Sequence, residues 1–203
     1  MKKLIFLALA ILFIGPVFSQ DFTKVVNAKL IHWYGLDFTK AKMIGSIGFT
    51  KPDIICNRYV HEKWNGLVFS EPEKYDIGKL TGGKEINIHL DYILKRNSLV
   101  IQDNLIINEN YEITKSDVQE ILNEYPDEDG LGLVFVIESF NKLNDTANIW
   151  VTFFDTKTKE IFKIQKYTSE PGGFGVLNYW LGGVYDTCKQ LKKDYKQWEK
   201  GIS

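Results

Sequence analysis

Histidine and cysteine offer the widest range of chemistry in this chain, and both are rare. The histidines are His32, His61 and His89, and none has the spacing of a metal-binding pattern such as His-x-x-x-His or His-Glu-x-x-His. Cys-x-x-Cys and the Gly-x-Ser-x-Gly turn of serine hydrolases do not occur either. We therefore expect no metal site, no cofactor and no catalytic activity. A cleft with His32 or His89 beside a carboxylate would instead favour an enzyme.

The two cysteines, Cys56 and Cys188, leave two alternatives open. In an oxidising compartment an even pair can form a disulfide. Both cysteines also fall on apolar stripes of predicted helices, where a free thiol behaves as a small buried side chain. The pairing needs a Cα separation below about 7 Å, which spacing alone does not establish.

The glycine-rich segment at residues 172–180 (GGFGVLNYW) is the most distinctive motif. Glycine permits positive φ, and free N–H groups at a helix start can hold an anion or a carbonyl group. The alternative is a tight strand-to-helix connection in which Phe174, Tyr179 and Trp180 pack at the edge of the core. If the segment binds a ligand, the candidate residues are Gly172, Gly173, Phe174, Gly175, Asn178 and Trp180.

Two further features are candidates for binding. Asp127, Glu128 and Asp129 form an acidic loop, but the spacing does not match an EF-hand, so we expect a solvated turn. Aromatic residues make up 14% of the chain, which predicts a ring-rich core or an exposed aromatic surface. An aromatic-lined binder of glycans or small molecules would use Trp33, Trp64 and Trp180.

The amino terminus has the pattern of a secretory signal. Two lysines precede an apolar run over residues 4–14, which is shorter than the roughly 20 residues of a membrane span. We expect residues 1–19 to be the signal peptide, cleaved before Gln20, and residues 20–203 to form one domain. Neither cysteine directly follows the signal, so we expect no lipid anchor and no membrane span after cleavage.

Charge disfavours nucleic acid as a partner. The chain has 25 basic and 26 acidic residues, and two of the basic residues lie in the expected signal. Such a balance gives no electrostatic attraction to a polyanion.

Hydrophobic periodicity predicts an α/β fold of the order βαβαβββα. It consists of a single mixed sheet of about five strands with three helices packed on it. The expected strands are residues 24–36, 85–92, 131–137, 147–154 and 160–167, and the expected helices run from residue 52 to 69, from Thr114 or Ser116 to 125, and from 177 to 199. Residues 85–92 also fit a helix through Ile86, Leu90, Ile93 and Leu94, and residues 98–108 fit a short strand.

Five short segments resemble a group of secreted Bacteroidetes-type proteins over most of the mature chain. The segments are residues 33–38 (WYGLDF), 74–76 (KYD), 153–155 (FFD), 172–175 (GGFG) and 178–180 (NYW). An arginine is common before the last segment in that group, and Leu177 stands there in this chain. The element order also resembles the amino-terminal domain of TolB and CsgG-like envelope domains. These resemblances imply secretion and a fold, and they imply no reaction.

Together these patterns favour a noncatalytic exported protein of the periplasm or cell surface. We expect a binding or interaction module whose partner is an envelope protein or a small ligand. The aromatic-lined glycan or small-molecule binder is the alternative.

Overall fold

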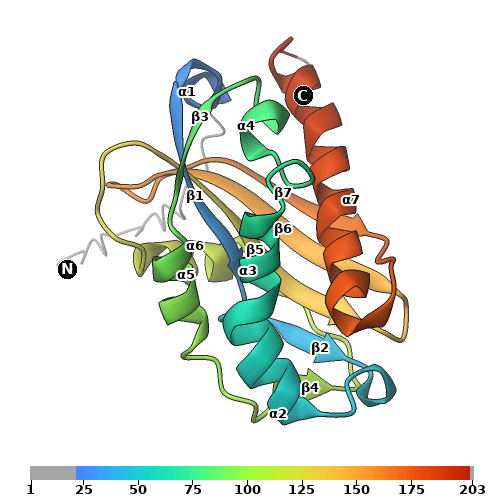
Figure 1. The fold of residues 1–203 in the computed structure, drawn as a ribbon. Helices are drawn as coiled ribbons and strands as arrows, with labels where there is room; N and C mark the ends of the chain where they lie inside the picture. The colour runs from blue at the N-terminus through green and yellow to red at the C-terminus, as the bar shows by residue number, and fades with distance from the viewer. Residues whose placement is uncertain (1–21, 202–203) are drawn as a thin grey trace, which may run out of the picture.

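The computed structural model describes residues 22–201, which form one mixed β-sheet with helices on both faces (Figure 1). The strands are β1 (Leu30–Asp37), β2 (Lys42–Ile44), β3 (Glu85–Ile88), β4 (Ile106–Ile107), β5 (Leu131–Asn141), β6 (Thr146–Asp155) and β7 (Ile161–Ser169). The helices are α1 (Phe22–Asn27), α2 (Pro52–Ile54), α3 (Trp64–Ser70), α4 (Ile77–Leu80), α5 (Leu90–Asn97), α6 (Lys115–Asn123) and α7 (Gly175–Trp198), with a 3₁₀ turn η1 (Ser46–Gly48) and a π-helical segment η2 (Ile55–Lys63). The expected signal peptide lies outside the described residues.

Strand β5 is central, and all of its residues are buried. One edge of β5 pairs in parallel with β1 and then with β2, while the other edge pairs antiparallel with β6 along its length. Strand β3 lies beyond β1 and also runs parallel to it. The sequence expectation of a buried central strand is confirmed, because an apolar run can be covered on both faces only inside a sheet.

Two cores lie on opposite faces of the sheet. The larger core lies under η2, α3 and α7 and includes Trp64, Phe140 and Trp180. The smaller core lies under α6 and includes Tyr34 and Tyr125. Helices on both faces explain why β5 is buried along its whole length.

The α/β fold class with one mixed sheet is confirmed, and the element counts are larger than expected. The sheet has seven strands instead of five, and α1, α4 and α5 add to the three expected helices. The 146–169 hairpin and the long helices from residues 52 and 175 are present. No helix within residues 22–201 is long and apolar enough to cross a membrane.

Two segments expected as strands contain helices. Residues 22–27 form α1, because Phe22 packs edge-on against Tyr195 and Trp198 of α7 at 5.4 and 5.0 Å between ring centroids. That packing outweighs the β propensity of Val25 and Val26. In the second segment only residues 85–88 are extended, and α5 begins at Leu90, so both interpretations of residues 85–94 hold in part.

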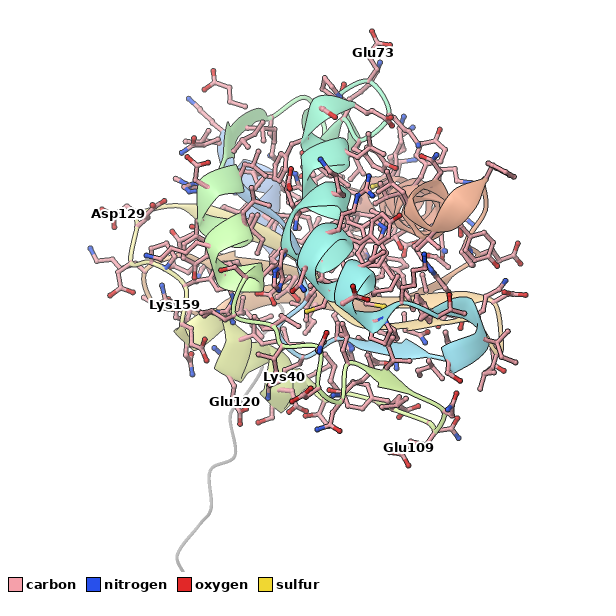
Figure 2. All side chains as sticks on the ribbon, turned by 60° about the horizontal axis from the view of Figure 1, so that its bottom comes forward. Lys40, Glu73, Glu109, Glu120, Asp129 and Lys159 are labelled. Atoms are coloured by element: carbon pink, nitrogen blue, oxygen red, sulfur yellow. The ribbon has the colours of Figure 1, made fainter. Side chains whose placement is uncertain are left out.

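Helix α6 begins as its sequence predicts. Thr114 and Asp117 form a capping box, in which each side chain accepts a hydrogen bond from the other residue's backbone amide. Lys40 donates to Asp117 over 2.8 Å and to Glu120 over 2.6 Å, and Figure 2 shows Lys40 beside Glu120. The hydrogen bond from Lys40, with those from Thr114, holds the pKa of Asp117 well below its usual range.

A buried ion pair joins β1 to α5. Arg96 Nε donates to Asp37 Oδ2 over 2.6 Å, and the two side chains are 6% and 0% exposed. The hydroxyl of Tyr125 also donates to Asp37 Oδ2, over 2.8 Å. A second nitrogen of Arg96 donates to Glu124, whose side chain is exposed. Asp37 therefore compensates the positive charge of Arg96 inside the protein, and Glu124 pairs with the same guanidinium from the solvent side.

Candidate functional site

The glycine-rich segment folds back onto the first turns of α7. The backbone amide of Gly172 donates to the carbonyl oxygen of Tyr179 over 2.9 Å. Gly173 and Gly175 have φ of 127° and 76°, and a Cβ on Gly182 would overlap the backbone of Gly172. Glycine is therefore required for this close approach. The amide of Gly172 is also engaged internally, so it is not free to hold an anion.

Trp180 is buried at the edge of the larger core, as expected for a tight strand-to-helix connection. Its ring is 1% exposed and stacks on Phe49 and Phe140 at 5.3 and 4.9 Å between centroids. Phe174 differs from that expectation, because it is 96% exposed. The positive φ at Gly173 and Gly175 turns the chain so that Phe174 points away from the core.

The start of α7 is fastened to the turn between β5 and β6. Tyr179 donates its hydroxyl proton to Asp145 over 2.6 Å and accepts from Lys142 over 3.0 Å. Lys142 also pairs with Asp145 at 2.6 Å. The backbone amide of Lys142 donates to Ile44 of β2 over 2.7 Å. These contacts join the start of α7, the turn between β5 and β6 and the end of β2 at one end of the molecule.

We call this region the end surface. Its exposed apolar side chains are Ile47, Leu143 and Phe174, which are 89%, 59% and 96% exposed. They flank a hollow of about 170 Å³, which is lined by Gly48, Lys142, Gly175, Val176, Tyr179 and Trp180. In Figure 1 the end surface is at the end of the molecule where α7 begins, away from the carboxyl terminus. The end surface thus combines apolar side chains with a backbone fixed by hydrogen bonds.

The tryptophans proposed for an aromatic binding platform are all buried. Trp33, Trp64 and Trp180 are 3%, 0% and 1% exposed. Trp64 stacks on Phe38 at 5.3 Å, and Trp33 packs edge-on against Phe135 at 4.8 Å. The three rings are therefore too buried to form an exposed stacking platform, although Trp180 borders the hollow of the end surface.

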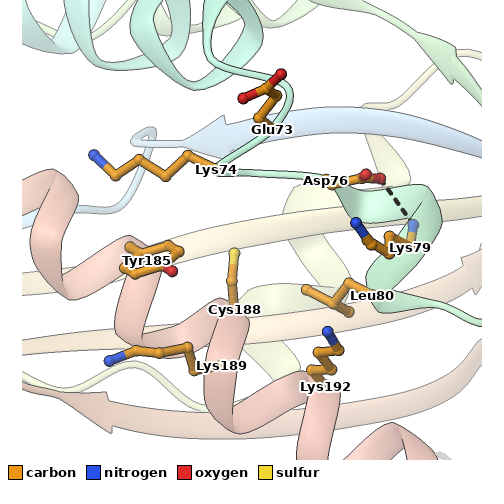
Figure 3. A pocket seen from close by; sticks show the side chains of 9 residues that line it. All are labelled: Glu73, Lys74, Asp76, Lys79, Leu80, Tyr185, Cys188, Lys189 and Lys192. Atoms are coloured by element: carbon orange, nitrogen blue, oxygen red, sulfur yellow. Dashed lines mark hydrogen bonds between the residues drawn. The ribbon is translucent and has the colours of Figure 1, made fainter.

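The cysteines are free and buried, in agreement with the second of the two alternatives. The thiol of Cys56 donates to the carbonyl oxygen of Val100 over 3.2 Å. Cys188 lies at the bottom of a hollow of about 220 Å³ between α4 and α7 (Figure 3). Burial raises the pKa of Cys188 to about 12, so this thiol is poorly reactive.

The free thiols give a direct test of the bridge. We expect alkylation in denaturant to add two alkyl groups whether or not the protein has first been reduced, because no disulfide protects either sulfur. Intact-mass spectrometry measures this. A gain of two alkyl groups that required reductant would show that the cysteines are bridged.

The hollow beside Cys188 is rich in lysine, and its charges are nearly balanced. Lys74 pairs with Glu71 at 3.3 Å, and Lys189 pairs with Asp186 at 2.9 Å. The hollow is also lined by Glu73, Asp76, Lys79 and Lys192, with Asp76 and Lys79 side by side at the start of α4 (Figure 3). With four lysines near four carboxylates, the hollow has little net attraction for an anion.

The acidic loop is held by the turn of the β6–β7 hairpin. Lys159 pairs with Asp127 at 2.9 Å, and Lys157 pairs with Asp129 at 3.1 Å. Figure 2 shows Asp129 and Lys159 at this corner of the molecule. The side chains of Asp127 and Asp129 are 78% and 87% exposed. Asp127 and Asp129 therefore belong to a solvated turn, as expected.

Glu128, the remaining acid of this loop, points to two histidines. His32 Nδ1 lies 2.9 Å from His89 Nε2 and 3.0 Å from Glu128 Oε2, and His89 Nε2 lies 3.6 Å from the same carboxylate oxygen. His61 is elsewhere and contacts the carbonyl oxygen of Val100 at 2.8 Å. Within residues 22–201, this is the one place where three potential metal-ligand side chains converge.

The sequence patterns did not predict this convergence. His32 lies in β1, and His89 follows β3, which pairs with β1 so that His32 is opposite Asn87. Burial, together with the neighbouring His32, lowers the pKa of His89, although Glu128 opposes the shift. The neutral form of His89 is therefore favoured. A histidine therefore lies beside a carboxylate, which is one part of the condition stated above for an enzyme. The other part, a cleft, is not shown, because His32, His89 and Glu128 do not line either hollow described above.

No model of a known protein family matches this chain, and no curated protein matches it.

Proposed function

We propose that this protein is an exported, noncatalytic binding module of the cell envelope, in the periplasm or at the cell surface, and that it binds a partner protein through the end surface. The observation that carries the proposal is the exposure of Phe174, Ile47 and Leu143 together at the end surface, beside the contacts that join Tyr179, Lys142 and Asp145. The signal-like amino terminus and the topological resemblance to envelope domains support export.

Rigid exposed apolar groups are suited to protein recognition. Phe174 and Ile47 are almost fully exposed, so they gain apolar burial only when another molecule covers them. The side chains of Tyr179, Lys142 and Asp145 bind one another beside these groups, which reduces the conformational entropy that this region loses on binding.

The size of the hollow favours a protein partner over a small ligand. At about 170 Å³ it is smaller than the roughly 300–1,000 Å³ of most small-molecule pockets. A hollow of this size suits one inserted apolar side chain, with Phe174 packing beside it. Lys142 and Asp145 pair with each other at its rim. We therefore propose an uncharged, apolar segment of an envelope protein as the occupant.

Replacing Phe174 should weaken binding without unfolding the protein. Loss of an anchor residue costs about 2 kcal/mol or more, so we expect Phe174→Ser to weaken partner binding by roughly 30-fold. The melting temperature should hardly change, because Phe174 is 96% exposed. Quantitative capture of the partner from envelope extracts, combined with thermal denaturation, measures both effects.

Leu99 provides the matched control. It is 73% exposed and follows α5, away from the end surface, so Leu99→Ser should leave capture unchanged. Equal loss of capture with both variants would contradict the proposal. Self-association of the purified protein that depended on Phe174 would also contradict it, by identifying the occupant as a second copy.

A further inference from the structure

The side chains of His32, His89 and Glu128 have the arrangement of metal ligands. Their ligand atoms are separated by 2.9, 3.0 and 3.6 Å. In a tetrahedral zinc site with bonds of about 2.0–2.2 Å, neighbouring ligand atoms lie roughly 3.3 Å apart. The three separations scatter around that value, so one ion can contact all three atoms with little side-chain movement.

From this geometry we infer that His32 Nδ1, His89 Nε2 and Glu128 Oε2 form a binding site for a divalent transition-metal ion such as Zn²⁺. Two imidazole nitrogens and one carboxylate oxygen are the ligand types of zinc, copper and nickel sites, whereas magnesium and calcium prefer sites made of oxygen. This site is separate from the end surface and does not depend on the proposed partner.

The hydrogen bonds within the cluster compete for the same atoms. His32 Nδ1 lies within 3.4 Å of Asn87 Nδ2 as well as close to His89 and Glu128. If His89 Nε2 carries the proton, the lone pair of His32 Nδ1 faces the Glu128 carboxylate oxygen at 3.0 Å. If His32 Nδ1 carries it, that one N–H is shared between His89 and Glu128. A cation among the three ligand atoms interacts with a lone pair of each.

The surrounding structure holds the two rings in place. The ring of His89 stacks on Tyr34 at 4.5 Å between centroids, with 26° between the ring planes. The ring of His32 lies against Gly130, where a Cβ would come within 2.9 Å of it. Glycine at position 130, with φ of 145°, therefore leaves the space that His32 occupies. Ligands held by such packing lose little entropy on metal binding.

The loop that carries Glu128 is also fixed. Thr156 Oγ1 donates to the carbonyl oxygen of Glu128 over 2.7 Å, and the amide of Thr156 donates to that of Gly130 over 3.0 Å. Lys159 Nζ donates to the carbonyl oxygen of Pro126 over 2.8 Å. These contacts fix the backbone on which the Glu128 side chain is carried.

The site is open to solvent on one side. The histidine side chains are 10% and 14% exposed, whereas that of Glu128 is 36% exposed. An ion can therefore enter past Glu128, and three protein ligands leave a coordination position for water or an external ligand.

Metal titration of the purified mature protein tests the site. After removal of metal with a chelator, we expect calorimetry with Zn²⁺ to show one ion bound per chain. Cobalt(II) should give the visible absorption of a tetrahedral centre with nitrogen and oxygen ligands. Zn²⁺ should also raise the melting temperature, because a ligand that binds only the folded state stabilises it.

Variants of the three ligands should lose this binding. His32→Ala, His89→Ala and Glu128→Gln should each weaken Zn²⁺ binding by more than the roughly 10- to 100-fold that removal of an outer hydrogen bond costs. His89 makes no side-chain capping bond at the start of α5, but its ring stacks on Tyr34. The melting temperature of each variant without metal therefore separates loss of packing from loss of the metal site.

His61→Ala and Asp129→Asn are the matched controls. His61 is the one histidine outside the cluster, and Asp129 belongs to the same loop but pairs with Lys157. Both variants should bind Zn²⁺ as the wild type does. Absence of one-to-one binding in the wild type, or equal losses in ligand and control variants, would overturn the inference.

Discussion

Replacing Trp180 with alanine should lower the free energy of unfolding by about 3–5 kcal/mol, the usual cost of truncating a buried aromatic side chain. Trp180 is 1% exposed and stacks between Phe49 and Phe140. Phe140 in turn packs edge-on against Trp64 at 5.1 Å. The substitution would therefore leave a cavity inside a continuous aromatic cluster, which cannot close without moving α7.

The same substitution should disturb the end surface, because Trp180 lines its hollow. Urea denaturation measures the stability, and Trp198→Ala is the control within α7. Trp198 is only partly buried and packs on Phe22 near the end of the helix, so its loss should cost less. If Trp180→Ala lowered the free energy of unfolding no more than Trp198→Ala, the role of Trp180 in the larger core would be contradicted.

The second large effect should come from Asp37→Asn, which should destabilise the protein by about 3–5 kcal/mol because it leaves a buried charge without its partner. Arg96 has a 6% exposed side chain and donates to the fully buried carboxylate of Asp37. The substitution keeps the shape of the side chain and removes the negative charge that compensates the guanidinium.

Glu124→Gln tests the same arginine from the solvent side. Glu124 also pairs with Arg96, at 2.8 Å, but its side chain is 67% exposed, and exposed pairs contribute about 0–1 kcal/mol. Chemical denaturation of both variants should therefore show a large loss for Asp37 and a small one for Glu124. Similar losses of stability in the two variants would mean that burial does not determine how much each ion pair of Arg96 contributes.

Elements defined by local patterns could be predicted from the sequence. The capping box of Thr114 and Asp117 depends on residues three positions apart. Strands β6 and β7 are neighbours in the sequence and pair across a short turn. The apolar stripe of α7 likewise follows from its own period. Each of these signals needs no knowledge of the rest of the chain.

The remaining elements depend on distant contacts. α1 follows from the packing of Phe22 on Tyr195 and Trp198, and the three-residue strand β2 is fixed by its pairing with β5. Neither packing partner can be identified from the local sequence. The β propensity of residues 24–29 therefore predicted a strand where α1 lies, and β2 was too short to be predicted.

The two sites were hidden for the same reason. His32 and His89 are 57 positions apart, and only the parallel pairing of β1 with β3 brings them together. The exposure of Phe174 depends on how the glycine-rich segment folds against α7. The residue types indicated that the histidines and the glycine-rich segment were candidates for function. The geometry of both sites follows from the tertiary structure.

Site-specific photo-crosslinking from position 174 in the native cell envelope tests the central claim most directly. With a photoreactive amino acid in place of Phe174, which is 96% exposed, the account predicts a covalent adduct with one partner protein. The same group at Leu99, which is 73% exposed, should give no such adduct. Crosslinks that are absent at position 174, or equal at both positions, would contradict the end surface as the binding site.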